Sequence, residues 1–180
     1  VMICGQGVVH SGAWKEAAAL SKMQEMPVGS TINAKGCLNE HEPLSLGVIG
    51  ARGGREWNNR MVKEADVILF AATSTDSANT DGWKLPSPNS GQKFIQIDIA
   101  ERELGNNYDA LPLFGDARET LTALTAALAE RPRPDRGAWA ARCAEEKAAH
   151  EKKLEAIMAR CGDEPHPLSL VRAIERLTPD

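Results

Sequence analysis

The chain has 180 residues, of which 42% are hydrophobic and 26% charged, and its formal net charge is −4. This length suffices for one domain with its own core. The mildly acidic balance lacks the basic stripe of a nucleic-acid binder, and no apolar run approaches the ~18 residues of a membrane span. The four cysteines form no Cys-x-x-Cys pair, which argues against a zinc site or a disulfide framework and favours a cytoplasmic protein.

The chain opens directly on apolar residues, without Met and without a signal peptide, so we expect it to be cut from a longer protein. Val1–Cys4 is typical of a buried strand. Ser11 is a candidate N-cap of a helix carrying Ala13, Ala17 and Leu20 at helical spacing. A second strand is predicted from Pro27 to Thr31, followed by a glycine-rich loop over residues 32–54.

Alternation of strand and helix signals continues through the middle of the chain. Trp57, Met61 and Ala65 lie four residues apart and predict a helix. Residues 67–72 form an apolar run without polar alternation, as a parallel strand covered on both faces requires. After a loop over residues 74–92, strands are predicted at 94–99 and 111–114. Pro112 favours an edge position for the latter.

A helix from Ala117 to Leu128, with leucines along one stripe, completes the pattern. Strands separated by helices predict an α/β fold with a three-layer open parallel sheet of five or six strands, Rossmann-like. We place this central domain at residues 1–130.

Residues 131–180 are predicted to be a linker and a helical tail. Arg131–Pro134 has linker composition. A long charged helix over residues 138–161, ended by Gly162, carries only a thin apolar stripe, and a short helix follows Pro167. Because this tail is too polar to form its own core, we expect it to pack on a neighbour and to lead toward a further, cofactor-binding domain.

Gly5 and Gly7 follow the first strand, and Gly12 lies beyond them. Glycines at a strand-to-helix turn let the backbone approach a phosphate at a helix N-terminus. The spacing differs from G-x-G-x-x-G, so the motif is weak, and a tight turn explains the glycines equally well.

Ligands of open parallel sheets bind outside the carboxyl ends of the strands. Asp98 ends a strand and offers a carboxylate to a ribose hydroxyl, whereas Asp116 is favoured as the cap of the following helix. The candidate cofactor-binding residues are therefore Gly5, Gly7, Ser11, Thr31, Thr73, Asp98, Ile99, Gly115 and Asp116.

No catalytic or metal-binding set is predicted. The histidines at positions 10, 41, 150 and 166 are far apart, and surface or loop roles are favoured for each. Lys35 is a possible anion contact, but a solvated lysine is the favoured interpretation.

Several segments, in order, carry a family resemblance. They are residues 3–8 with 11–13, 27–31, 35–36 and 41–47, Asn58 or Asn59 with 64–69, Thr80 with Trp83, and 95–99 with 103–108 and 115–117. Together they resemble the central domain of thiamine diphosphate-dependent enzymes, of which the acetolactate synthase group is the nearest type. The resemblance covers about residues 1–130. Residues 167–180 resemble the linker and first helix of the domain that follows.

This resemblance implies a parent enzyme of three domains that acts on 2-oxo acids and is a homodimer or homotetramer. The first domain supplies a glutamate that activates thiamine diphosphate, and the third holds Mg²⁺ and the diphosphate through a GDG…N motif. Gly115-Asp116-Ala117-Arg118 lacks that motif. The implied role is a scaffold between the neighbouring domains, not catalytic alone, and in some branches a site for FAD or an ADP-bearing group. The sequence has Ala72-Thr73-Ser74 where FAD-binding members carry G-A-R, which favours a branch without FAD.

Two other interpretations compete with this one. A free-standing FAD-, NAD- or ADP-binding module would use the glycine turn and Asp98. An NAD-dependent deacylase would need a catalytic histidine and zinc cysteines, and neither is evident in the sequence.

Overall fold

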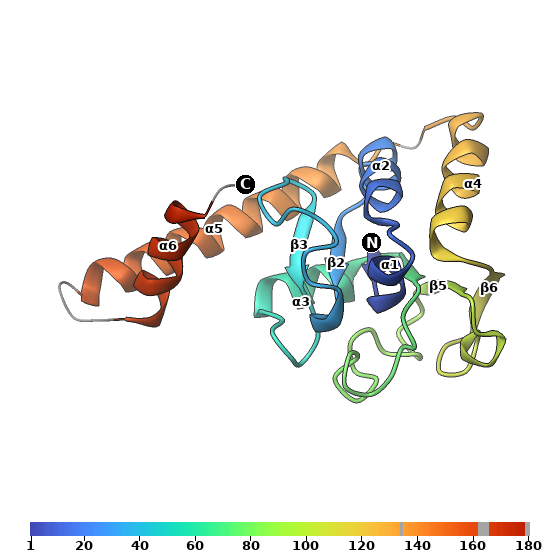
Figure 1. Ribbon diagram of the computed structural model, residues 1–180, viewed down its shortest axis with the longest axis horizontal. Helices are drawn as coiled ribbons and strands as arrows, with labels where there is room; N and C mark the ends of the chain where they lie inside the picture. Colours follow the sequence, from blue (N-terminus) through green and yellow to red (C-terminus); the bar gives the residue numbers. More distant parts are fainter. Residues whose placement is uncertain (134, 162–165, 179–180) are drawn as a thin grey trace.

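Six parallel strands form one open sheet in the computed structural model (Figure 1), which describes residues 1–133, 135–161 and 166–178. The order across the sheet is β3-β2-β1-β4-β5-β6. This confirms the predicted open parallel sheet. The strands are β1 (Met2–Cys4), β2 (Val28–Ser30), β3 (Ser45–Val48), β4 (Val67–Ala71), β5 (Lys93–Asp98) and β6 (Ala110–Phe114).

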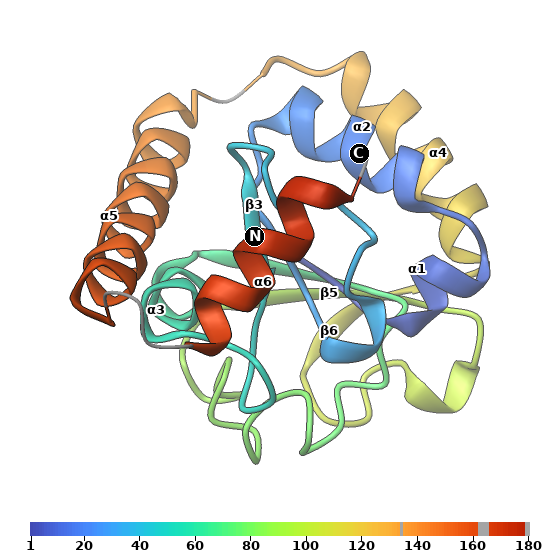
Figure 2. The same ribbon diagram turned by 60° about the vertical axis from the view of Figure 1, so that its left-hand side comes forward.

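Helices cover both faces of the sheet (Figure 2). One face carries α1 (Gln6–His10), α2 (Trp14–Gln24) and α4 (Ala117–Ala129), and the other carries α3 (Glu56–Glu64) and α5 (Gly137–Cys161). Short 3-10 turns, η1 (Ile32–Ala34) and η2 (Glu101–Glu103), and the last helix, α6 (Pro167–Leu177), complete the described elements. Within these ranges, no helix combines the length and apolar character needed to cross a membrane.

The core is divided by the sheet into two apolar clusters. Met2 and Cys4 of β1 pack toward α2 and α4, whereas Val1 and Ile3 pack toward α3, as the period-two geometry of a strand requires. Burying apolar side chains on both faces is the main stabilising contribution of such a sheet.

Residues 72–92 connect β4 to β5 and take the place of a crossover helix. They cover the sheet with Leu85, which is buried beside Phe70, Phe94 and Tyr108. The Tyr108 ring lies 4.8 Å from the Phe70 ring and 4.9 Å from the Phe94 ring, and its hydroxyl donates to the Pro86 carbonyl at 2.9 Å. Burial raises the pKa of Tyr108 to about 12, so this hydroxyl remains a donor at physiological pH.

Strand β3 corrects the prediction of an unbroken loop over residues 32–54. It is a four-residue edge strand that pairs with β2 through a register shift after Val28. Its sequence, Ser-Leu-Gly-Val, has only two large apolar residues. So short a run between turn residues lacks the periodicity by which a strand is identified.

The first helix also differs from the prediction. α1 begins directly after Gly5, and Ser11 is its C-cap, not the N-cap of the following helix. The Ser11 hydroxyl donates to the Gly7 carbonyl at 2.8 Å. α2 begins after Ala13, which provides no side-chain cap. Ser and Thr also bond back to helix carbonyls, so a serine near a helix end does not by itself show which end it caps.

Other predictions are confirmed. β6, with Pro112, is an edge strand, and the Asp116 carboxylate caps α4 by accepting from the N–H groups of Arg118 and Glu119 at 2.8 and 3.2 Å. Ala65 lies just beyond α3, while Trp57 and Met61 are buried within it. Gly162, predicted to end the long helix, lies outside the described residues.

The turn from β1 into α1 is packed against the end of β4. Gly5 N–H donates to the Ala71 carbonyl at 2.8 Å, and Gly7 N–H donates to the Ala72 carbonyl at 3.1 Å. A β-carbon on Gly5 would lie 2.2 Å from the Ala72 oxygen, and one on Gly7 would lie 2.5 Å from the Ala72 β-carbon. Close backbone approach therefore requires both glycines.

The long helix α5 packs on α3 through its N-terminal half. Cys143 is buried in the same apolar cluster as Trp57 and Met61, with Trp139 packed against it. Arg60 of α3 pairs with Glu146 at 2.5 Å, and Arg142 pairs with Glu64 at 2.5 Å. The neighbour on which this part of the polar tail packs is thus a helix of the same chain.

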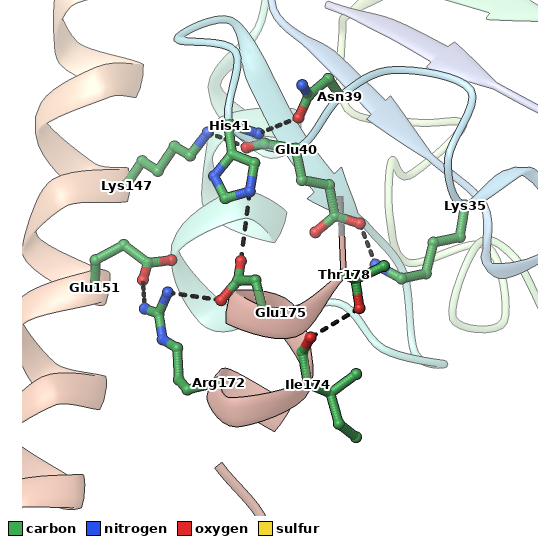
Figure 3. A network of polar contacts seen from close by, with 10 residues as sticks. All are labelled: Lys35, Asn39, Glu40, His41, Lys147, Glu151, Arg172, Ile174, Glu175 and Thr178. Carbon is green, nitrogen blue, oxygen red and sulfur yellow. Dashed lines mark hydrogen bonds and ion pairs between the residues drawn. The ribbon is translucent and has the colours of Figure 1, made fainter. Parts of the chain in front are cut away.

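Helix α6 meets α5 and the loop before β3 through polar contacts (Figure 3). Arg172 binds Glu151 of α5 at 2.7 Å and Glu175 at 3.1 Å, and Glu175 lies 3.4 Å from the His41 Nε2. Lys147 of α5 donates to the Glu40 carbonyl and, at 2.9 Å, to the Glu42 carbonyl. Lys35 pairs with Glu40, and its side chain is 58% exposed to solvent.

Replacing Gly5→Ala is expected to destabilise the chain by about 3 kcal/mol, because the new methyl group meets main-chain atoms that cannot rotate away. Urea unfolding measures the effect. The matched control is Gly137→Ala, where the nearest heavy atom is 3.4 Å away and helix propensity favours alanine. Equal midpoints for the two variants would contradict the packing described for this turn.

Cys143 is expected to resist alkylation in the folded chain. Burial raises its pKa to about 11, which lowers the thiolate population at pH 8 about a hundredfold. Peptide mass spectrometry after iodoacetamide treatment should show slow labelling that Trp139→Ala accelerates and that Lys152→Ala, on the exposed side of α5, leaves unchanged. Labelling in native buffer at the rate seen in urea would show that α5 is not docked on α3.

Candidate functional site

A cleft of about 490 Å³ lies outside the carboxyl ends of the central strands. It sits where the strand order reverses between β1 and β4, the position at which open α/β sheets bind ligands. Its walls come from α1, the segments after β2, β4 and β5, and the start of α4. They consist of Gln6, Gly7, His10, Ser11, Thr31, Asn33, Ala72, Thr73, Ser74, Asp76, Asn79, Asp98, Ile99, Glu103, Asp116 and Ala117.

Most of the predicted cofactor-binding residues meet in this cleft. The walls include Gly7, Ser11, Thr31, Thr73, Asp98, Ile99 and Asp116. Two others do not line it. Gly5 lies against the Ala72–Thr73 backbone, and the Gly115 N–H donates to the Asp98 carbonyl at 3.0 Å. The strand-end rule therefore brings together residues that are far apart in the sequence, as expected for parallel strands.

The sequence prediction missed other polar residues of the cleft, among them Gln6, His10, Asn33, Asp76, Asn79 and Glu103. Gln6 and His10 belong to the unpredicted α1, on which they lie four residues apart and in contact at 3.2 Å. A helical spacing of four is the signal that could have paired them. Asp76 and Asn79 lie on an irregular loop, for which no periodicity exists.

The charge of the cleft is predominantly negative. Its carboxylates are Asp76, Asp98, Glu103 and Asp116, and His10 is its single titratable base. Among the described residues that form its walls, none is Lys or Arg. Like charges repel, so the cleft disfavours a diphosphate or another polyanion.

Several of these carboxylates already have hydrogen-bond partners in the chain. Asp98 accepts from the Ala100 N–H at 2.9 Å, and Asp116 caps α4. Asp76 accepts from the Ser74 hydroxyl at 3.1 Å and the Asn79 N–H at 2.9 Å. These bonds stabilise loops and helix ends, which is the usual role of Asp at such positions.

The loop that borders the cleft has an uncommon conformation. Ala72 and Thr75 have φ angles of 50° and 53°, in the left-handed region that side-chain-bearing residues rarely occupy. The Asn107 amide donates to the Thr75 carbonyl at 3.3 Å, and the Trp83 indole N–H donates to the same carbonyl at 3.1 Å. Strain of this kind persists only where surrounding contacts fix the backbone.

Gln96 links this loop to the next one from within β5, because its amide donates to the Thr73 carbonyl at 3.4 Å. It is fully buried, donates to the Glu103 carbonyl at 2.9 Å and accepts from the Gly105 N–H at 3.1 Å. A buried amide with its hydrogen bonds satisfied gives rigidity and register. The rim of the cleft is therefore fixed by internal contacts.

Comparison with known proteins identifies the family. Residues 1–124 match the family model described as the central domain of thiamine pyrophosphate enzymes. A probable acetolactate synthase large subunit of Methanocaldococcus jannaschii is 34% identical over 166 residues, which are 92% of this chain and 27% of that protein.

Two further relatives are named for other activities. A probable 2-ketoarginine decarboxylase of Pseudomonas aeruginosa is 36% identical over 156 residues, 83% of this chain and 26% of that protein. A 3D-(3,5/4)-trihydroxycyclohexane-1,2-dione hydrolase 2 of Bacillus cereus is 34% identical over 124 residues, 69% of this chain and 19% of that protein. The chain thus spans about a quarter of the length of these relatives, or less. It belongs to the family of thiamine pyrophosphate enzymes, of which it represents the central domain.

Proposed function

We propose that this chain is the scaffold domain of a longer thiamine diphosphate-dependent enzyme, similar to acetolactate synthase, that acts on 2-oxo acids. In this role it positions the domains on either side of it and contributes no catalytic group. The observation that carries the proposal is the charge of the cleft between β1 and β4, where the strand order reverses. Among the described residues, its walls hold four carboxylates and neither Lys nor Arg. The free buried cysteines fit a reducing cytoplasm.

The described residues do not fit thiamine diphosphate and Mg²⁺. A diphosphate needs cations or free N–H groups, whereas the N–H groups of Gly5 and Gly7 are bonded to carbonyls at the end of β4. Mg²⁺ needs clustered oxygen ligands, and no group of three or more His, Cys, Asp or Glu residues is arranged for a metal ion in the described ranges. We therefore assign the binding of both to other parts of the enzyme.

FAD and ADP meet the same obstacle. Ser74 stands where the FAD-binding members of the family carry an arginine. Its hydroxyl donates to the Asp76 carboxylate at 3.1 Å. A nucleotide diphosphate in this cleft would lack the charge-assisted bonds, each contributing ~1.5–3 kcal/mol, on which such binding depends. This geometry favours the scaffold role over a free-standing nucleotide-binding module.

We propose that the following domain packs on the exposed surface of helix α6. Its polar side holds Arg172 and Glu175 against α5 and the loop at His41. Its apolar side chains Leu170, Val171, Ile174 and Leu177 are all exposed, Leu177 to 85%. An amphipathic helix docked by its polar face presents its apolar stripe to another body. The parent enzyme is then an assembly of neighbouring domains around this one, as a homodimer or homotetramer.

Titration calorimetry of the chain with FAD, ADP, NAD and Mg²⁺–thiamine diphosphate should show no saturable heat at micromolar concentrations, because the cleft repels anions. Asp76→Asn with Asp98→Asn removes two negative charges and should weaken that repulsion without creating a site. A dissociation constant of about 1 μM or tighter for any of these ligands would contradict the scaffold role.

Substituting Leu170→Ser together with Ile174→Ser should leave the unfolding midpoint of residues 1–180 nearly unchanged, since both side chains are exposed here. In the longer enzyme the same pair should lower the midpoint and the activity, because the stripe is buried there. Glu155→Gln, an exposed change on α5, is the control. An unaffected longer enzyme would rule out α6 as the contact between the domains.

A further inference from the structure

A second cavity, of about 270 Å³, lies between α3 and α5 and shares no residue with the cleft at the strand ends. Residues of α3 and its N-cap line one side of this cavity, namely Arg55, Glu56, Trp57 and Arg60. Residues of α5 line the other side, namely Glu146, Ala149, His150 and Lys153. Nothing in the scaffold role requires these side chains to surround a cavity.

Cations outnumber anions in its walls. Arg55, Arg60 and Lys153 face two carboxylates. Arg60 is paired with Glu146 at 2.5 Å, whereas neither Arg55 nor Lys153 has an ion-pair partner within the part of the chain that the structure describes. With His150 neutral, the walls carry one excess positive charge.

Two buried polar atoms in these walls lack hydrogen-bond partners among the described residues. They are the Trp57 indole Nε1 and the His150 Nε2. Trp57 is only 8% exposed, and its ring centre lies 6.1 Å from that of His150. Buried N–H groups without acceptors are rare because their desolvation is uncompensated. The indole offers a donor only, so an acceptor is what it lacks.

The local field also favours an anion. The pKa of His150 is lowered, first by burial and then by the positive charges of Arg55 and Lys153, while Glu151 opposes the shift. Glu151 is itself bound by Arg172 of α6. The remaining charged groups of the walls are Glu56 and Arg60 from α3 and Glu146 from α5. The first turn of α3, a helix of nine residues, adds its positive end beside the cavity.

We propose that this cavity binds a small tetrahedral oxyanion of the phosphate class, held by Arg55 and Lys153 and by the N–H groups of Trp57 and His150. The anion stabilises the protonated form of His150, so binding takes up a proton and strengthens as the pH falls. The proposal is independent of the assignment of the cleft.

The test follows the indole N–H resonances of the ¹⁵N-labelled chain during titration with sulfate, whose charge is constant across the pH range used. Four tryptophans give four signals, and Trp57→Phe assigns one of them. The Trp57 signal should shift until it saturates, with a dissociation constant for sulfate of about 1 mM or tighter. Sulfate should bind more tightly at pH 6 than at pH 8, and the other three signals should not move.

Variants decide whether the site is specific. Arg55→Gln and Lys153→Gln should each weaken binding about tenfold, whereas Lys152→Gln, a neighbouring exposed lysine outside the walls, should not. His150→Gln should retain binding at pH 8 and lose the gain at pH 6. Inorganic phosphate and glycerol phosphate distinguish two kinds of site. A site for the free anion binds inorganic phosphate only, whereas a site for a phosphorylated metabolite binds both ligands. A Trp57 signal that does not move, or equal losses for Lys152→Gln and Lys153→Gln, would overturn the proposal.

Discussion

The rest of this structure depends on the contact between the β1–α1 turn and the end of β4. Two main-chain hydrogen bonds, from Gly5 to Ala71 and from Gly7 to Ala72, join the strands at which the sheet order reverses. This contact brings α1 to the cleft and fixes Ala72 in a left-handed conformation. It also occupies the N–H groups that a phosphate would need at this turn, so the same packing that builds the cleft limits what the cleft can hold.

The proposed scaffold role rests on the hydrogen-bond partners of the polar groups in this domain. Around the cleft, Asp98, Asp116 and Gln96 bond to neighbouring main-chain groups and so fix loops and helix ends. Relatives that are 34–36% identical to this chain are named for different activities, so domains of this kind occur in enzymes of different chemistry. The polar groups around the cleft form hydrogen bonds to the domain's own main chain, and its relatives differ in chemistry. Both features suit a structural role that is shared by different enzymes.

The sequence predicts the buried parts of the fold well, because burial leaves a periodic signal. The apolar run of β4 and the leucine stripe of α4 are examples. β3 escaped prediction because four residues with one glycine have no measurable period, and Ser11 was assigned to the wrong helix because its hydroxyl can bond at either end. The residues predicted from the glycine turn and the strand ends make up seven of the sixteen residues in the walls of the cleft. Asp76 and the cavity walls at His150 depend on tertiary contacts between distant segments, which no local pattern records.

Amide hydrogen exchange at Gly5 and Gly7 is the decisive measurement, because it reports whether these N–H groups are bonded within the chain. We expect both amides to exchange only through global unfolding, and we expect saturating ADP or FAD to leave their rates unchanged. Rapid exchange in the absence of ligand, followed by protection when a nucleotide is added, would show that the turn is an open phosphate site and would contradict the account.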